Sequence, residues 1–208
     1  EFHFLGFGTM NGPDGKPFKT RDGGIMSLSS LVQMVTDSSY EKLTQTQENP
    51  SKEDALNIGT AAIKFGDLIN HPVSDYVFDI DKFLSFEGKT GSYILYNNVR
   101  ILAILNRLEA KQAYEVKKIK GEHDRNLILK LLRNPEVFLN AIQNQAPTHV
   151  AEATYQIAVA FAKFYTENNI SKESDEEQKE SWLGLLQKTS QIITFNLDKL
   201  GIKTVEKM

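Results

Sequence analysis

The sequence contains no cysteine among its 208 residues. That absence excludes a disulfide framework, a zinc ribbon and a thiol nucleophile, and it fits a reduced, cytoplasmic setting. No apolar run approaches the roughly 18 residues that a membrane span needs, so we expect no membrane partner. The N-terminus lacks the basic region and cleavage site of a secretory signal. The first residue is Glu1 rather than methionine, and we therefore expect a piece of a longer protein.

An excess of positive charge is also lacking. The chain has 24 Lys and Arg against 27 Asp and Glu, a formal net charge of −3. This argues against a generic electrostatic coat for DNA, so we expect no DNA partner, and a nucleic acid could be bound only by a local surface. A basic stretch is interpreted as a solvated face in preference to a nucleic-acid patch, and an acidic stretch as a helix cap and linker. The basic residues are Lys111, Lys117, Lys118, Lys120, Arg125, Lys130 and Arg133, and the acidic residues are Glu173, Asp175, Glu176, Glu177 and Glu180.

Helical periodicity dominates the chain after about residue 25, so the predicted fold is mainly α, a helical bundle. Between the helices, residues 75–86 are predicted to be extended and then to form a helical turn. The most apolar predicted helix, 148–165, is expected to be central, and Trp182 is expected in the core. Trp182 begins an apolar seam along the predicted helix 181–200, which should stop at Gly201, and the seam continues through Leu186, Thr189, Ile193, Leu197 and Leu200. Helices are predicted over residues 27–35, 52–69, 92–111, 122–133, 148–165 and 181–200, with a further helix starting at Asn134–Pro135.

A glycine-rich loop over residues 6–24 is the first candidate for chemistry. Pro17 follows Gly15-Lys16 where a phosphate-binding P-loop needs Ser or Thr, and the dinucleotide-binding fingerprint is absent too. Cations on a glycine-flanked loop can close over a polyphosphate, but spacing alone favours a solvated basic turn. The cations and the hydroxyl that could serve in this way are clustered at Lys16, Lys19, Thr20 and Arg21.

A second candidate is one face of the predicted helix 92–111. Its apolar arc is predicted to be Leu95, Val99, Leu102, Leu105 and Leu108, and the opposite side carries Tyr93, Tyr96, Arg100 and Arg107. Tyrosine rings and guanidinium groups stack on unpaired bases. Packing against a neighbouring domain explains the face equally well. A third group, Asp75, Asp79 and Asp81, lacks the spacing of a calcium loop and is interpreted as helix caps and local hydrogen-bond acceptors.

Four segments of the chain resemble the arginyl-tRNA synthetases, a family of class I aminoacyl-tRNA synthetases. They are residues 7–24, Asp-Tyr-Val-Phe-Asp-Ile-Asp at 75–81, residues 86–96 followed by Arg100, and Leu-Gly-Ile-Lys-Thr-Val-Glu-Lys-Met at 200–208. The resemblance covers essentially the whole chain and implies the C-terminal portion of such an enzyme. Residues 1–90 then hold the end of a class I nucleotide-binding catalytic domain, with the signature loop at 6–24, and connecting helices. Residues 91–208 form a helical-bundle anticodon-binding domain.

The same resemblance implies roles for individual residues. The segment Phe18–Arg21 stands where related enzymes carry a Lys-Met-Ser-Lys-Ser loop, which helps to form the aminoacyl-adenylate from ATP. The implied catalytic residues are Lys16, Lys19, Thr20 and Arg21, and the implied ATP-site residues are His3, Phe7, Gly8 and Phe18. The implied anticodon-binding residues are Tyr93, Tyr96, Arg100, Tyr165 and Met208.

By resemblance, the full-length enzyme attaches arginine to arginine tRNA using ATP with Mg²⁺, in the cytoplasm and as a monomer. This chain alone is expected to lack ligase activity and to hold no tightly bound cofactor or metal, because the family's upstream His-Ile-Gly-His-like motif is missing from it. A helical protein-interaction module without RNA function is the alternative.

Overall fold

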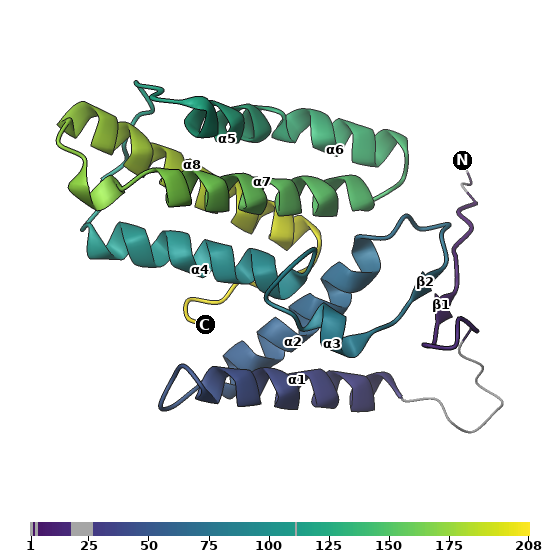
Figure 1. Ribbon diagram of the computed structural model, residues 1–208. Coiled ribbons are helices and arrows are strands. Elements are labelled where there is room, and N and C mark those ends of the chain that lie inside the picture. Colours follow the sequence, from purple (N-terminus) through teal and green to yellow (C-terminus); the bar gives the residue numbers. More distant parts are fainter. Residues whose placement is uncertain (1, 3, 18–26, 111) are drawn as a thin grey trace.

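The computed structural model describes residues 2, 4–17, 27–110 and 112–208. Within these residues the chain is mainly helical, which confirms the predicted fold class. Helices α1 and α2 pack together beside a larger bundle of α4, α5, α6, α7 and α8 (Figure 1). No helix in this described part is both long and apolar enough to cross a membrane.

In the part of the chain that the structure describes, the elements are short strands, α-helices and a 3-10 helix. In chain order they are β1 (Met10–Asn11), α1 (Leu28–Thr44), α2 (Lys52–Leu68), β2 (Tyr76–Val77), α3 (Ile80–Phe83), α4 (Gly91–Arg107), α5 (Glu122–Leu132), α6 (Asn134–Gln143), α7 (Thr148–Glu167), η2 (Ile170–Lys172) and α8 (Glu176–Lys199).

Helix α1 begins where the sequence predicts but is longer. The Ser27 side chain caps it by accepting a hydrogen bond from the Ser30 amide. The helix then runs to Thr44 rather than ending at Val35. Leu43, in its last turn, is buried in the main core, and this tertiary packing extends a helix that local sequence does not favour.

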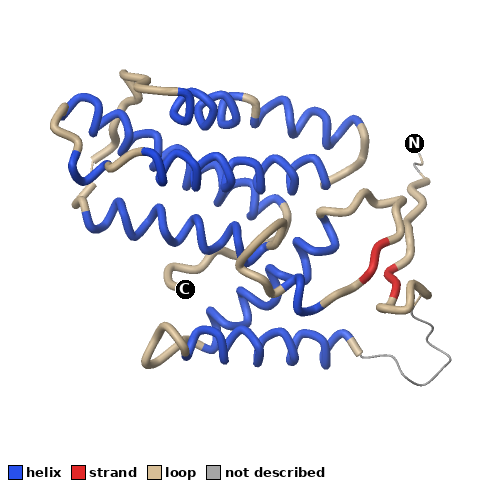
Figure 2. The backbone as a smooth tube through the Cα atoms, in the orientation of Figure 1, coloured by secondary structure: helices blue, strands red, loops and turns tan. Residues whose placement is uncertain are grey.

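The two strands pair on one side of the molecule, near the N-terminus (Figure 2). They are parallel, with Met10 opposite Tyr76. The short helix α3 follows β2 and is capped by Asp79, whose carboxylate accepts from the Lys82 amide at 3.1 Å. The prediction of an extended segment followed by a helical turn is therefore confirmed, as is the role of Asp79 as a cap.

Helix α7 is the centre of the bundle and contacts α4, α5, α6 and α8, as its apolar composition predicts. Helix α8 starts at Glu176 rather than at residue 181, because Asp175 caps it by accepting from the Gln178 amide. Trp182 is 2% exposed, which confirms it as core. The rest of the predicted seam of α8 is also buried, and it comprises Leu186, Thr189, Ile193, Leu197 and Leu200.

The buried face of α4 differs from the predicted one. Ile94, Ile101 and Ile104 are buried together with the polar residues Asn97 and Asn98. Of the predicted arc, Leu95 is buried, whereas Val99, Leu102, Leu105 and Leu108 are only partly buried. The predicted arc followed aliphatic residues alone and therefore left out the two buried asparagines. The Asn98 Oδ1 atom accepts from the Ser190 hydroxyl of α8 at 2.8 Å, so that side chain is satisfied within the bundle.

Candidate functional site

The N-terminal segment is attached by its backbone to the loop between α2 and α3. The Gly8 amide donates to the Pro72 carbonyl at 2.8 Å. The amide and hydroxyl of Thr9 donate to Asp75 Oδ1 at 2.7 and 2.9 Å. These hydrogen bonds hold the pKa of Asp75 below its usual range, because they stabilise the ionised carboxylate. A Cβ atom on Gly8 would lie 2.2 Å from the Ser74 carbonyl oxygen, so this approach requires glycine.

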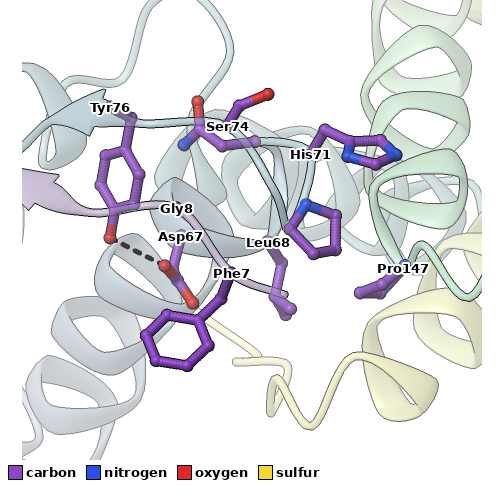
Figure 3. A pocket seen from close by; sticks show the side chains of 10 residues that line it. Phe7, Gly8, Asp67, Leu68, His71, Ser74, Tyr76 and Pro147 are labelled. Carbon is purple, nitrogen blue, oxygen red and sulfur yellow. Dashed lines mark hydrogen bonds between the residues drawn. The ribbon is translucent and has the colours of Figure 1, made fainter. Parts of the chain in front are cut away.

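A pocket of about 300 Å³ lies where this segment crosses the end of α2 (Figure 3). The Tyr76 hydroxyl donates to Asp67 Oδ1 at 2.7 Å within it. Burial of the phenol, followed by that hydrogen bond, raises the pKa of Tyr76, so the hydroxyl keeps its proton. The pocket is lined by Phe7, Gly8, Asp67, Leu68, Asn70, His71, Pro72, Ser74, Tyr76 and Pro147.

Of the residues expected at the ATP site or in catalysis, the structure describes Phe7, Gly8 and Lys16. Phe7 and Gly8 line the pocket, and the Phe7 side chain is 89% exposed. Lys16 is exposed in a tight turn, in which its carbonyl accepts from the Gly12 amide at 2.9 Å and Gly15 has φ +73°. The expected roles of His3, Phe18, Lys19, Thr20 and Arg21 fall on residues outside those that the structure describes.

The parallel helices α4 and α7 meet along a seam at which polar and aromatic side chains pair. We call it the α4–α7 seam. Its pairs are Lys89 with Glu152 (Nζ–Oε2 2.8 Å), Tyr93 with Tyr155 (ring centroids 5.7 Å apart), Arg100 with Tyr165 (Cζ 4.4 Å from the ring centroid) and Arg107 with Ser171 (Nη2–Oγ 3.4 Å). Aromatic rings and cations alternate along the seam.

The Arg100–Tyr165 pair joins two residues that lie far apart in the sequence. A guanidinium 4.4 Å from a ring centroid is within the range of a cation–π interaction. Tyr93 is half-buried beside Tyr155, and this burial raises the pKa of Tyr93. Tyr93 therefore presents a neutral ring to whatever contacts the seam.

The other two expected anticodon residues lie apart from this pair. Tyr96 is 43% exposed and its ring packs edge-on to Phe86, with the centroids 6.4 Å apart. The Lys42 ammonium lies over the Phe86 ring, 5.3 Å from its centroid. Met208 is partly buried against the main core. The structure thus brings Arg100 and Tyr165 together and leaves Tyr96 and Met208 at other contacts.

A hollow of about 370 Å³ opens beside the Arg100–Tyr165 pair. The end of α7 and the segment that follows it form most of its wall, and no motif in the sequence singles these residues out. Its lining residues are Arg100, Tyr165, Thr166, Glu167, Asn168, Asn169, Ile170 and Ser171.

The basic and acidic stretches are paired with each other. Lys118 Nζ lies 2.7 Å from Asp175 and 2.9 Å from Glu177, and Lys120 Nζ lies 2.5 Å from Glu173. Hydrogen bonds from these lysines lower the pKa of Asp175 and of Glu173. Lys118 and Lys120 therefore serve in ion pairs at the surface, which supports the interpretation that favoured a solvated face.

Asp75, Asp79 and Asp81 do not form a metal site. Asp75 accepts hydrogen bonds from Thr9, and Asp79 caps α3. Among the residues that the structure describes, no group of three or more His, Cys, Asp or Glu side chains could hold a metal ion.

Two family models match the chain. Residues 94–208 match the DALR anticodon binding domain, and residues 1–80 match the catalytic domain of class I tRNA synthetases (R). The first match includes the Arg100–Tyr165 pair and the hollow beside it. The second includes the pocket at Gly8 and the turn at Lys16.

Curated relatives and solved structures cover nearly the whole chain. It is 46% identical over 211 residues to an arginine–tRNA ligase of Alkaliphilus oremlandii and 39% identical over 224 residues to one of Agathobacter rectalis. These alignments cover 99% and 100% of this chain but 36% and 37% of those proteins, so the chain spans about a third of their length.

Two solved structures resemble the fold. The Thermus thermophilus arginyl-tRNA synthetase matches with a TM-score of 0.87 at 24% identity, over 98% of this chain and 35% of that one. The arginyl-tRNA synthetase of Plasmodium falciparum matches with a TM-score of 0.75 at 28% identity, over 88% of this chain and 34% of that one.

Proposed function

Because the chain belongs to the arginyl-tRNA synthetase family, with a DALR anticodon binding domain at residues 94–208, we propose that it binds the anticodon region of arginine tRNA. The observation that carries the proposal is the stacked Arg100–Tyr165 pair at the α4–α7 seam, beside a hollow of about 370 Å³. Unpaired RNA bases are bound by such platforms, because every base offers a π face and a guanidinium adds positive charge. Tyr93, Tyr96 and Met208 are the further anticodon contacts that we propose.

We also propose that the whole protein attaches arginine to tRNA at the expense of ATP with Mg²⁺. Phe7 and Gly8 line a pocket, and both residues belong to the part that matches a class I catalytic domain. Lys16 belongs to the same part and lies in the turn that follows them in the sequence. In this proposal His3, Phe7, Gly8 and Phe18 approach the nucleotide. Their neighbours Lys16, Lys19, Thr20 and Arg21 stabilise the charge that develops on its phosphates.

The domain boundary belongs to the same proposal, with the catalytic end and connecting helices over residues 1–90 and the anticodon-binding domain over 91–208. The protein acts as a monomer in the cytoplasm. The 208-residue chain alone has no ligase activity, since it spans about a third of the length of its ligase relatives. Arginine-dependent aminoacylation by the isolated chain would contradict this part.

Equilibrium binding of the chain to arginine tRNA, and to the same tRNA with an altered anticodon, tests the central proposal. Measurements at two salt concentrations separate base contacts from phosphate contacts, because phosphate binding weakens steeply with salt and carries no sequence information. We expect discrimination between the two tRNAs that persists at the higher salt. Weak binding that salt removes and that ignores the anticodon would favour the alternative, a protein-interaction module.

Single substitutions then locate the surface. Arg100→Ala and Tyr96→Ala should each weaken binding to the native tRNA by about tenfold, because one base stack contributes about 1–3 kcal/mol. Arg125→Ala is the matched control, since it removes an exposed positive charge from α5. If all three variants bind alike, neither Arg100 nor Tyr96 belongs to the RNA-binding surface.

A further inference from the structure

The last residues of α7 and the segment that follows it, residues 166–171, carry polar side chains beside the Arg100–Tyr165 pair. Glu167, Asn169 and Ser171 are exposed and line the hollow. Glu167 forms no ion pair with any residue that the structure describes. Its carboxylate is therefore an acceptor at the edge of a cavity whose aromatic side is made by Tyr165.

The segment is fixed in place by a buried carboxylate. Asp124 is 1% exposed, and its Oδ1 atom accepts from the Asn168 side-chain amide at 3.2 Å. Its Oδ2 atom accepts from the Trp182 indole at 2.8 Å and from the Lys120 amide at 2.9 Å. Ile170, only 2% exposed, anchors the middle of the segment in the core. Because this wall of the hollow is anchored to the core, it can present polar groups at defined positions, which selective binding requires.

The chemistry of the hollow favours one kind of ligand. At about 370 Å³ it is at the small end of the range of ligand pockets, roughly 300–1,000 Å³. A stacked ring and guanidinium bind a flat aromatic ring, and a carboxylate accepts a hydrogen bond from an exocyclic amino group. Phosphate, by contrast, would be repelled by Glu167.

We propose that the hollow binds one unpaired base of the RNA loop and that Glu167, assisted by Asn169, selects a base with an exocyclic amino group. The inference rests on the proposed anticodon-binding function and adds two specificity-determining residues to it. The base stacks beside Arg100 and Tyr165, and its amino group donates to the Glu167 carboxylate. Uracil presents a carbonyl oxygen at the corresponding edge, which leaves that carboxylate without its donor and places two acceptors together.

The test uses anticodon stem-loop RNAs in which each anticodon position carries either cytosine or uracil. The two pyrimidines have nearly the same size and differ on one edge, at position 4, which carries an amino group or a carbonyl oxygen, and at N3, which is unprotonated in cytosine and protonated in uracil. For the unaltered chain we expect a preference for cytosine of about tenfold at one position. Glu167→Met keeps an unbranched side chain of similar length but removes the acceptor, and the preference should fall to less than about threefold. Asn169→Ala should reduce it to a smaller extent.

A non-specific electrostatic effect of the Glu167→Met substitution would strengthen RNA binding rather than remove the preference for cytosine. Removing a negative charge strengthens RNA binding in general, so Glu167→Met should bind the uracil-containing loop at least as tightly as before. Glu48→Met makes the same change in the exposed loop between α1 and α2 and should leave the preference for cytosine intact. Unfolding is not expected to interfere, because Glu167 ends α7, where a negative charge opposes the helix dipole.

The outcomes distinguish a failure of this inference from a failure of the proposed anticodon binding. If Glu167→Met keeps the full preference at every position while Arg100→Ala weakens binding, the hollow does not select the base and anticodon binding stands. If the unaltered chain does not distinguish any anticodon substitution, the anticodon-binding proposal itself fails.

Discussion

Phenylalanines in two regions of the molecule have opposite environments. In the N-terminal segment, Phe2, Phe4 and Phe7 are 106%, 96% and 89% exposed, whereas Phe161 and Phe164 in α7 are both 0% exposed. The bundle is therefore stabilised by burial of apolar surface, and the N-terminal segment by backbone hydrogen bonds to the loop between α2 and α3. The difference indicates that the free energy of unfolding resides mainly in the bundle. The segment before it presents apolar side chains that the described chain does not cover.

Truncating a phenylalanine in each region should give the largest contrast. Phe161→Ala leaves a cavity in a core that is close-packed, and we expect the free energy of unfolding to fall by about 3–5 kcal/mol. Phe7→Ala removes a side chain that makes little contact and should change it by less than about 0.5 kcal/mol. Urea denaturation followed by far-ultraviolet circular dichroism measures both. Equal losses would show that the N-terminal segment also belongs to the cooperative core.

A buried pair of amides in the bundle should give the next largest effect. The side chains of Asn134 and Asn196 exchange two hydrogen bonds, at 3.1 and 2.9 Å, and are 7% and 0% exposed. Asn196→Leu leaves the Asn134 amide buried without its partner, which costs about 1–3 kcal/mol.

The double variant Asn134→Leu/Asn196→Leu is the control for that effect. It removes both polar groups and should recover part of the loss in the same urea experiment, because no amide is then left unsatisfied. A loss equal to the sum of the two single losses would mean that the two side chains contribute independently.

The fold was predictable wherever burial follows the helical period. The seam of α8, the central place of α7 and the glycine at which α8 ends were all expected, and Gly201 has φ +68°. The length of α1 and the buried face of α4 were not. Both regions bury polar residues, Ser39 in α1 and Asn97 and Asn98 in α4. Local composition places such residues at the surface, and only the packed structure shows that they are buried.

The candidate site was only partly predictable, for a similar reason. Aromatic and arginine residues on one predicted helix drew attention to Tyr93, Tyr96 and Arg100. Glu167 and Asn169, which line the hollow, have neither a motif nor a periodicity. They are brought beside Arg100 by the packing of α7 against α4 and by the anchor at Asp124. No spacing in the sequence encodes that contact.

A glycine substitution should have a smaller and more local effect. Gly8→Ala places a Cβ atom 2.2 Å from the Ser74 carbonyl oxygen, so the N-terminal segment must move away. We expect faster hydrogen exchange at the Tyr76 amide, which donates to the Thr9 carbonyl at 3.1 Å, with a change of less than about 1 kcal/mol in the free energy of unfolding. Gly6→Ala is the matched control, because no atom lies within 4 Å of its added Cβ. Equal exchange in the two variants would contradict the close approach.

The smallest predicted effect is a shift in one titration at the same contact. Hydrogen bonds from Thr9 lower the pKa of Asp75 in the folded state below the usual value of about 3.9. The carboxylate therefore stabilises the contact above pH 4, and this contribution is lost as the pH falls through the lowered pKa. Thr9→Val removes the hydroxyl donor and keeps the amide donor, so the pKa of Asp75 should rise only part of the way.

Carboxyl chemical shifts measured by nuclear magnetic resonance between pH 2 and 6 would record this change. Asp175 in the bundle serves as the internal reference, because its pKa is lowered by Lys118 rather than by Thr9 and its midpoint should not change in the Thr9→Val variant. If the Asp75 midpoint also stays constant, the hydroxyl does not contribute, and the amide of Thr9 alone connects the N-terminal segment to Asp75. If the midpoints of both Asp75 and Asp175 change, the N-terminal segment is coupled to the bundle. That coupling would be closer than the contrast between exposed and buried phenylalanines indicates.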